Sequence, residues 1–489
     1  MKYRNPIIKG FYPDPSVCFA NGKYYLASSS FQFFPGIPLF ESEDLVNWER
    51  IGYALTRTSQ VNLDKIFSSG GIFAPTIRYN NGRFYIVVTN DTTHKNFYVW
   101  TDDIYGEWSD PIFVDQGGID PSLLFDNGKV YFISNGEDEN GVYGIIQCEI
   151  DIATGQKLCE GRCIWQGSGG RFPEGPHMYK IGGRYYLVAA EGGTEYGHMV
   201  TYSRSDSVWG PFENFRDNPV LTNRDKAPYS IQGIGHGELV QDRAGDWHII
   251  CLGFRQIHAW MTYHHLGREV FMVPVEFDDD GWFTAGTYGT CDEYYDIAGD
   301  FIQEDKRYYT FENMLWNTDW QYLRKPKPEN YIFEKDRITL KGTSVSLDDT
   351  DSPTFICTHQ HDFGFTMKIT VHTDGGEAGV TFYYDETEHY DIAIRKRGDG
   401  FETVLRLNIG GINHEQTTAF SNDGTVNITV TADKMEYVFM ANGLMIGRAA
   451  SKYLSSEVCG GFTGTVIGLY AVGHNTAEFT DLEINYDNV

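Results

Sequence analysis

One short sequence phrase occurs five times before residue 250, and it limits the possible folds more than any other feature. Each copy has a small or polar residue, an apolar run, a glycine turn and a second run that opens near aromatic residues. Asn-Gly between two β-rich runs is the strongest short-range signal for a hairpin, so each copy predicts two antiparallel strands. The copies begin at Asp14, Ala74, Asp120, Glu174 and His236, and their turns lie at Gly22, Gly82, Gly128, Gly182 and Gly245.

The five hairpins recur at intervals of roughly 45 to 60 residues, which is typical of a repeat architecture with one sheet per repeat. Each hairpin continues into a third strand-like run, and antiparallel sheets joined head to tail commonly form a propeller. We therefore expect an all-β protein in which residues 1–298 form a five-bladed β-propeller. Because the first residue of each copy precedes the innermost strand, the five first residues are expected to meet at one end of the central channel.

A second all-β region follows. The stretch from Tyr294 to Lys306 loses the repeat and gathers Asp and Glu, so the domain boundary is expected there. Alternating runs such as Phe365 to Val371, separated by glycine turns, predict many short strands. Residues 307–489 are therefore expected to form a β-sandwich, a concanavalin-like jelly roll that packs on the propeller and helps to close its active site.

The charge and the cysteines restrict partners and location. A net charge of -28 argues against nucleic acid and against anionic membrane surfaces, because both would repel the chain. No stretch has the length of a signal peptide core or a membrane helix. The eight cysteines show no zinc-site spacing, and several lie in strand-like runs as expected for buried thiols. These features favour a reduced, cytoplasmic protein, and a homo-oligomer is compatible with them.

The first residues of the copies carry the candidate chemistry. An Asp-Pro start can simply hold a turn, but here Asp14, Asp120 and Glu174 place three carboxyl groups at one mouth. Such crowding costs stability unless the groups have a function. Two carboxyl groups that flank a sugar suffice for glycoside hydrolysis. Glu174, with apolar neighbours, is the expected acid, Asp14 the base, and Asp120 a third charge that tunes Glu174.

Three motifs resemble those of a known enzyme family. The segments Phe11 to Ser16, Gly118 to Ser122 and Glu174 to Tyr179 are similar to the three acidic motifs of glycoside hydrolase family 43. The resemblance covers the whole chain and implies a five-bladed propeller that acts with inversion on glycans containing arabinose or xylose. It implies Asp14 as general base, Asp120 as the residue that adjusts the pKa, and Glu174 as general acid.

The same resemblance assigns roles to His236 and Arg268. In relatives the histidine commonly helps to hold a hydrated calcium or another divalent cation on the axis, so calcium is a candidate cofactor. A core histidine that bonds only to its neighbours is the alternative, since one histidine is a poor calcium ligand by itself. Arg268 resembles a residue that contacts the substrate, where its planar donors would grip sugar hydroxyls. The alternative is a surface arginine on a strand.

Three phenylalanines are candidates for the sugar pocket, because apolar sugar faces stack on aromatic rings. Phe31 resembles a residue of the pocket's aromatic wall. Phe73 stands where relatives often carry Trp or Tyr, a departure that bears on the choice between furanose and pyranose. Phe462 lies in a loop that resembles one reaching over the pocket from the second domain. Each of these rings could instead belong to a hydrophobic core.

These features predict an inverting exo-glycosidase that releases terminal α-L-arabinofuranose, β-D-xylose or both from short hemicellulose or arabinan oligosaccharides. An endo-acting arabinanase is one alternative, and it would need an open cleft. A non-catalytic carbohydrate-binding propeller is the other, although such a protein has no need of a protonated glutamate.

Overall fold

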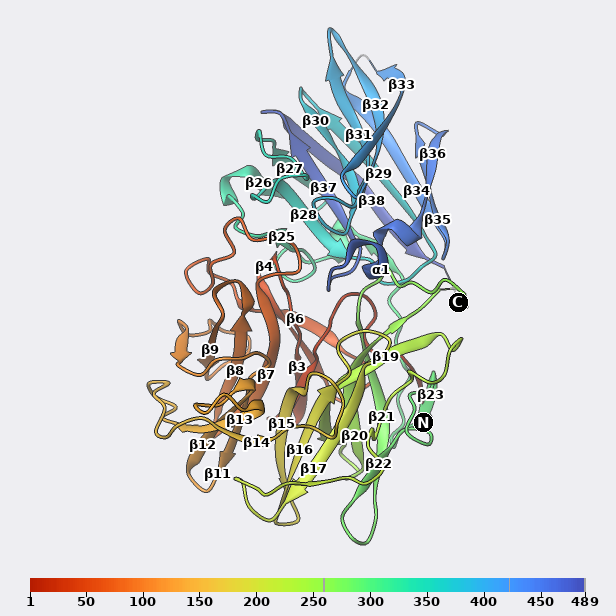
Figure 1. Cartoon of the computed structure of the whole chain (residues 1–489). Helices are drawn as coiled ribbons and strands as arrows, with labels where there is room; N and C mark the ends of the chain where they lie inside the picture. Colours follow the sequence, from red (N-terminus) through yellow and green to blue (C-terminus); the bar gives the residue numbers. More distant parts are fainter. Residues whose placement is uncertain (258–259, 422, 488–489) are drawn as a thin grey trace.

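Five four-stranded antiparallel sheets follow one another along the chain and form the lower domain in Figure 1. The structure is a computed structural model that describes residues 1–257, 260–421 and 423–487. Strands β1 (Lys2–Arg4) and β23 (Tyr294–Asp296) pair and bring the two ends of this domain together. The predicted all-β class and five-bladed propeller are therefore confirmed.

Each blade takes four strands in chain order, and the first strand is the innermost. Blades one and two contain β2 (Ser16–Ala20), β3 (Lys23–Ala27), β5 (Gly36–Ser42), β6 (Glu49–Leu55), β7 (Ile72–Asn80), β8 (Arg83–Asn90), β9 (Lys95–Thr101) and β10 (Ile112–Val114). Blades three and four contain β11 (Ser122–Asp126), β12 (Lys129–Glu137), β13 (Tyr143–Ile150), β14 (Arg162–Trp165), β15 (Glu174–Ile181), β16 (Arg184–Glu191), β17 (Met199–Ser205) and β18 (Glu213–Asn214). Blade five contains β19 (Ile231–Gln241), β20 (Trp247–Arg255), β21 (Glu269–Phe277) and β22 (Phe283–Ala285).

In blades two, four and five, a bulge in the innermost strand fixes which side chains reach the axis. In blade two the pairing with β8 shifts between Phe73 and Thr76, and in blade four the pairing with β16 shifts between Glu174 and His177. Each blade has one left-handed residue at the equivalent position, which lies two residues before the innermost strand in blades one and three and inside the bulge in the other three. The φ angles are 54° at Asp14, 42° at Ala74, 54° at Asp120, 54° at Gly175 and 47° at His236.

The bulge corrects one detail of the sequence alignment. The repeated phrase aligns Glu174 with Asp14 and Asp120, but the structurally equivalent residue of blade four is Gly175. Glu174 itself pairs with Ala190, as Phe73 pairs with Thr89 one position before Ala74. The reason is the left-handed conformation, which glycine and aspartate adopt more readily than glutamate. Glu174 therefore enters the site from the neighbouring position of its strand.

The second domain is a sandwich of two antiparallel sheets, as predicted. One sheet contains β24 (Tyr308–Thr310), β26 (Tyr331–Phe333), β27 (Arg337–Lys341), β29 (Phe365–Thr373), β34 (Thr425–Ala432), β35 (Glu436–Ala441), β36 (Leu444–Ala450) and β38 (Thr476–Tyr486). The other contains β28 (Thr354–His359), β30 (Glu377–Tyr383), β31 (His389–Arg397), β32 (Gly400–Ile409), β33 (Ile412–Ser421) and β37 (Val466–Val472). Alternating side chains such as Met367, Ile369 and Val371 point inward and form its core.

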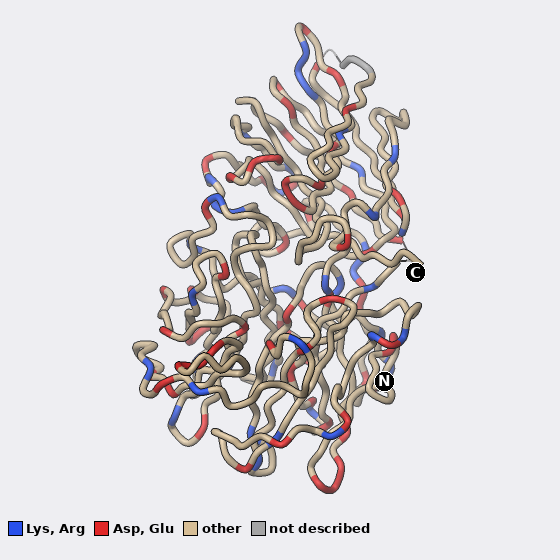
Figure 2. Tube along the Cα trace, in the orientation of Figure 1, with Lys and Arg blue, Asp and Glu red and all other residues tan. Residues whose placement is uncertain are grey.

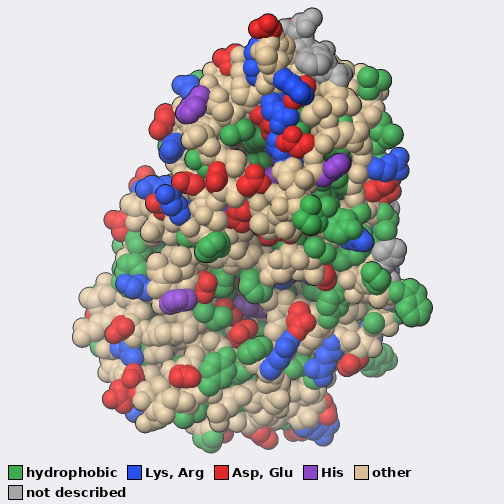
Figure 3. Space-filling view, turned by 45° about the horizontal axis from the view of Figure 1, so that its top comes forward, with side chains coloured by type: hydrophobic (Ala, Val, Ile, Leu, Met, Phe, Trp, Pro, Cys, Tyr) green, Lys and Arg blue, Asp and Glu red, His purple; other side chains and the backbone are tan. Residues whose placement is uncertain are grey.

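The helical segments are short. They are η1 (Asp91–Thr93), η2 (Phe311–Asn313), η3 (Pro328–Asn330), η4 (Ser451–Leu454) and α1 (Ser456–Cys459). Within the described ranges, no helix has the length and apolarity that crossing a membrane requires. Acidic and basic residues are interspersed along both domains (Figure 2) and over the face shown in Figure 3.

The two domains are joined by paired backbone as well as by side chains. β4 (Phe33–Phe34) of the propeller pairs with β25 (Tyr322–Leu323) of the second domain. Next to this pair, the side chain of Arg324 is fully buried. Its Nε donates to the carbonyl oxygen of Ile66 at 2.6 Å, and its guanidinium forms an ion pair with Glu386. Arg324 therefore ties blade one to the sandwich.

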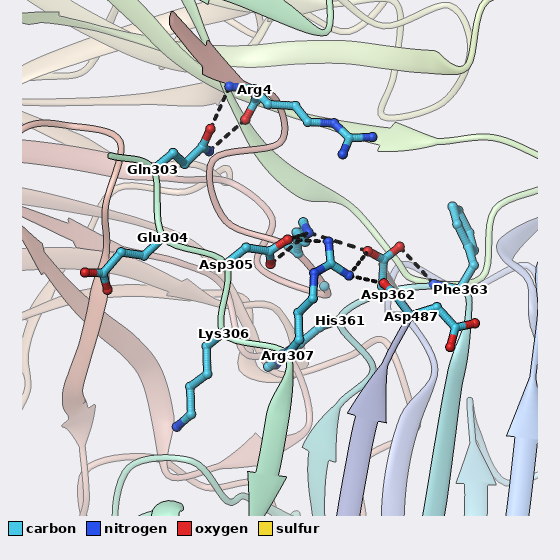
Figure 4. Close-up of polar contacts among 12 residues, drawn as sticks. Arg4, Gln303, Glu304, Asp305, Lys306, Arg307, His361, Asp362, Phe363 and Asp487 are labelled. Carbon is cyan, nitrogen blue, oxygen red and sulfur yellow. Dashed lines mark hydrogen bonds and ion pairs between the residues drawn. The ribbon is translucent and has the colours of Figure 1, made fainter. Parts of the chain in front are cut away.

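A cavity of about 1400 Å³ lies where the N-terminal segment, blade one and the interdomain segment meet. Its wall includes an ion-pair network in which Asp305 and Asp362 both approach Lys9 and Arg307 (Figure 4). None of the three candidate carboxyl groups lines this cavity. The network braces the domain junction and is separate from the site described below.

Replacing Arg324 with Ala should lower the free energy of unfolding by about 3–5 kcal/mol, because Glu386 would remain as a partly buried charge without its partner. Arg216→Ala is the matched control. The Arg216 side chain is 89% exposed and pairs only with Asp217, so the change there should stay within about 0.5 kcal/mol. Denaturant unfolding followed by tryptophan fluorescence measures both. Equal effects would mean that Arg324 does not hold the domains together.

Candidate active site

The structure brings the three candidate carboxyl groups together at one end of the propeller axis. Asp14 and Asp120 are 7% and 9% exposed, and Glu174 is half-buried beside them. The Nδ1 atom of His236 lies 3.6 Å from Asp14 Oδ1 and 4.0 Å from Asp120 Oδ2. Residues that are far apart in sequence thus share one small space, as the five-bladed arrangement requires.

Asp14 is surrounded by groups that favour its ionised form. Its Oδ2 accepts a hydrogen bond from Ser29 Oγ at 2.6 Å, and its Oδ1 lies 3.3 Å from Arg268 Nη1. Burial alone would raise the pKa of Asp14, but Arg268, His236 and Ser29 outweigh burial and hold the pKa below its ordinary value. Asp14 is therefore a carboxylate at neutral pH.

Glu174 and Asp120 have the opposite tendency. Burial, with the charge of Asp14 second, raises the pKa of Glu174 to about 7. Burial also raises the pKa of Asp120, and the charges of Glu174 and Asp14 add to the shift. The backbone N–H of Gly175 donates to Asp120 Oδ2 at 3.1 Å and offsets part of this effect. The two carboxyl groups titrate as a coupled pair, which retains a proton near neutral pH.

Arg268 lies directly before β21 and is 5% exposed, so the surface alternative does not apply. Its Nη1 donates to Thr194 Oγ1 at 2.8 Å, and its Nη2 donates to the carbonyl oxygen of Phe462 at 3.1 Å. Its Nε is buried and has no hydrogen-bond partner among the described residues. The guanidinium thus joins Asp14, a blade-four loop and the second domain, which leaves few of its donors for a sugar.

The three candidate phenylalanines form one aromatic cluster beside Arg268. Phe31 and Phe73 have ring centroids 4.9 Å apart, and Phe462 lies 6.3 Å from Phe31 and 6.4 Å from Phe73. Phe31 is 2% exposed because Phe11 packs behind it. Its ring therefore supports the aromatic wall and offers little surface to a sugar. Phe462 is 44% exposed, so its ring is not part of the core of the sandwich.

Contacts with the propeller hold the Phe462 loop in place. The backbone N–H of Phe462 donates to Ser69 Oγ at 2.8 Å, and its carbonyl oxygen accepts from Arg268. A Cβ atom on the neighbouring Gly461 would lie 2.7 Å from Ser69 Oγ. Only glycine permits this close approach. The second domain therefore contributes an aromatic side chain at a defined position beside the carboxyl groups.

A second charged layer fills the axis below the carboxyl groups, and the sequence analysis did not single it out. Glu238 is fully buried, and its Oε1 lies 3.0 Å from Arg78 Nη1 and 2.9 Å from His177 Nδ1. Ser16 Oγ donates to the same carboxylate at 2.7 Å. The sequence does contain a signal for this layer. Ser16, His177 and Glu238 each lie two residues after the left-handed residue of their blade.

The surroundings of His236 do not fit a cation held by several protein ligands. Among the described residues, only Asp385, Glu388 and Cys459 bring three candidate ligand atoms together, and they lie in the sandwich. The Nδ1 and Cε1 edge of His236 is covered by Gly175, whose added Cβ would lie 2.9 Å from both atoms. Burial lowers the pKa of His236 to about 4, so the ring is neutral. Fixed positive charge near the axis comes from Arg78 and Arg268.

Comparison with known proteins agrees with this geometry. The "Non-reducing end alpha-L-arabinofuranosidase BoGH43B" of Bacteroides ovatus is 36% identical over 502 residues, which span 99% of this chain and 94% of that protein. A "Xylosidase/arabinosidase" of Butyrivibrio fibrisolvens is 31% identical over 517 residues, spanning 99% and 98%. The solved structure titled "Bacteroides ovatus Xyloglucan PUL GH43B" superposes with a TM-score of 0.92 at 35% identity, and each chain is covered completely.

The family assignment rests on both domains. Residues 3–283 match the family described as "Glycosyl hydrolases family 43". Residues 309–485 match the domain described as "Beta xylosidase C-terminal Concanavalin A-like domain". The predicted family is therefore confirmed, and the chain belongs to glycoside hydrolase family 43, with a catalytic propeller followed by a concanavalin A-like sandwich.

Proposed function

We propose that this glycoside hydrolase is an inverting exo-enzyme that releases single terminal pentoses from short hemicellulose or arabinan oligosaccharides. The observation that carries the proposal is one largely buried space in which the pKa of Asp14 is held below its ordinary value while the pKa of Glu174 is raised to about 7. The printed names of the full-length relatives, an arabinofuranosidase and a xylosidase/arabinosidase, support a pentose substrate.

In the proposed reaction the two carboxyl groups have separate roles. Asp14 accepts a proton from water, which attacks the anomeric carbon, while Glu174 donates its proton to the departing glycosidic oxygen. The anomeric configuration inverts because the water attacks from the face opposite the leaving group. Burial and the charge of Asp14 raise the pKa of Glu174, and Asp120 shares the retained proton with it. The positive charge of Arg268 keeps Asp14 ionised.

The position of Phe462 favours exo action over the endo-acting alternative. Ser69 and Arg268 hold its backbone, and its partly exposed ring lies beside the rings of Phe31 and Phe73. We propose that this ring closes one end of the sugar pocket. A closed end admits a chain terminus and excludes the interior of a polysaccharide. The raised pKa of Glu174 argues against a non-catalytic binding propeller, because sugar binding alone needs no proton donor.

We further propose that the enzyme acts in the cytoplasm on imported oligosaccharides. All eight cysteines are free thiols, which is compatible with a reducing compartment.

Hydrolysis of two nitrophenyl pentosides tests the function directly. We expect turnover of the α-L-arabinofuranoside, the β-D-xyloside or both, and we expect Asp14→Asn to lower kcat by about 10³-fold without loss of folding. Asp206→Asn, whose side chain is 91% exposed, should retain wild-type activity. Inactivity on both pentosides would favour the binding propeller, and release of internal fragments from arabinan would favour the endo-enzyme.

The coupled carboxyl pair predicts a pH effect. The basic limb of kcat/KM follows loss of the Glu174 proton, so activity should fall as pH rises through about 7. Asp120→Asn removes a neighbouring negative charge and should lower the pKa of Glu174, which moves this limb to lower pH by about one unit. Asp225→Asn, on a side chain that is 87% exposed, is the control. An unmoved limb in Asp120→Asn would show that Asp120 does not tune the acid.

The surroundings of His236 predict that a metal chelator leaves activity unchanged. We expect EDTA not to lower kcat and added calcium not to raise the melting temperature, since a ligand that binds the folded state would raise it. Loss of activity in EDTA with recovery in calcium would instead support the hydrated cation suggested by the family resemblance.

A further inference from the structure

Ser29 makes two hydrogen bonds at the catalytic floor, and together they fix the direction of its hydroxyl proton. Its Oγ accepts from the backbone N–H of Ala74 at 2.7 Å and lies 2.6 Å from Asp14 Oδ2. A carboxylate only accepts hydrogen bonds, so the single Ser29 proton must point at Asp14. A distance of 2.6 Å is typical of a hydroxyl that donates to an ionised oxygen.

A comparison between blades explains why this serine is required. In blade four, the left-handed Gly175 donates its N–H directly to the carboxylate of Asp120 in the preceding blade. In blade two, the left-handed Ala74 donates its N–H to Ser29 instead. Ser29 in turn donates a hydrogen bond to the carboxylate of Asp14. Blade two, whose bulge carries no ionisable side chain, therefore acts on Asp14 through Ser29.

We infer that Ser29, oriented by the N–H of Ala74, is the positioning residue that holds Asp14 in the geometry required of the catalytic base. The inference rests on the proposed base role of Asp14. Ser29 is 1% exposed and acts through Asp14 without reaching the sugar. Its bond occupies Oδ2 and fixes the plane of the carboxylate, so that Oδ1 faces Arg268 and His236.

Every other group that acts on Asp14 stays in place when Ser29 is changed. Arg268 precedes β21, His236 lies in β19 and His198 precedes β17, and all three favour the ionised form of Asp14. Asp120 and Glu174 approach it from blades three and four. A change in the titration of Asp14 after substitution of Ser29 therefore reports the loss of the Ser29 hydroxyl, which donates to Asp14 and accepts from Ala74.

The neighbouring Ser28 provides a matched control. It is also fully buried, and its Oγ donates to the carbonyl oxygen of Pro13 at 2.8 Å, next to Asp14 in the chain. Ser28→Ala and Ser29→Ala remove the same atom from adjacent positions. Only the second removes a contact with the carboxylate.

The test measures the pH dependence of kcat/KM, together with kcat and KM, for wild type, Ser28→Ala and Ser29→Ala. In Ser29→Ala we expect the acidic limb to move to higher pH by about one unit, because the lost bond stabilised the ionised form. We expect kcat to fall about tenfold to a hundredfold with little change in KM. Ser28→Ala should keep both the limb and kcat.

Two outcomes would overturn the inference. One is an acidic limb and a kcat in Ser29→Ala that match those of Ser28→Ala, since Ser29 would then serve packing alone. The second outcome applies if Ser29→Ala does not fold. Ser29→Cys then keeps the side-chain volume but has only a weak donor, and wild-type behaviour of that variant would also overturn the inference. Asp14→Asn in the same assay separates the two proposals. Its inactivity beside an unshifted Ser29→Ala defeats only the Ser29 inference, whereas its full activity defeats the base role as well.

Discussion

Three carboxyl groups in one largely buried space repel one another, and the surrounding structure compensates for this repulsion. Arg268 neutralises Asp14, while a retained proton reduces the charge of the Glu174 and Asp120 pair. Below them, Arg78 balances the buried charge of Glu238. Like charges at this distance shift pKa values apart, and that separation produces an acid and a base from identical chemical groups. The blades of the propeller bring these compensating residues to the carboxyl groups.

Much of this arrangement could be predicted from local sequence. The glycine turns and alternating runs indicate the hairpins, and their recurrence indicates the blades. The meeting of Asp14, Asp120 and Glu174 follows from that repeat alone. The register around Glu174 could not be predicted by aligning carboxyl groups, because a left-handed backbone rather than the side chain defines the equivalent position. The sequence signal for the equivalent position is the proline that directly follows it, after Asp14, Ala74, Asp120 and Gly175.

The remaining features depend on contacts between distant segments. Arg268 donates hydrogen bonds to Thr194 and Phe462, which are 74 and 194 residues away in the sequence. No local sequence pattern predicts these partners. The exposure of an aromatic ring also depends on contacts between segments that are distant in the sequence. Phe31 is covered by Phe11 and Phe462 is half open, although both are phenylalanines in short loop-like stretches. Family resemblance identified these residues, whereas their orientation became apparent only from the assembled domains.

The Phe462 loop also has a consequence for the order of events after bond cleavage. In the proposed exo mechanism this loop closes one end of the pocket, and the freed pentose and the shortened oligosaccharide then leave through the same opening. The oligosaccharide lies nearer the opening, so it departs first and the pentose follows. A pentose at high concentration then occupies the emptied pocket and competes with the next chain terminus. The loop that we propose to make the enzyme selective for chain ends would therefore also make it sensitive to its own product.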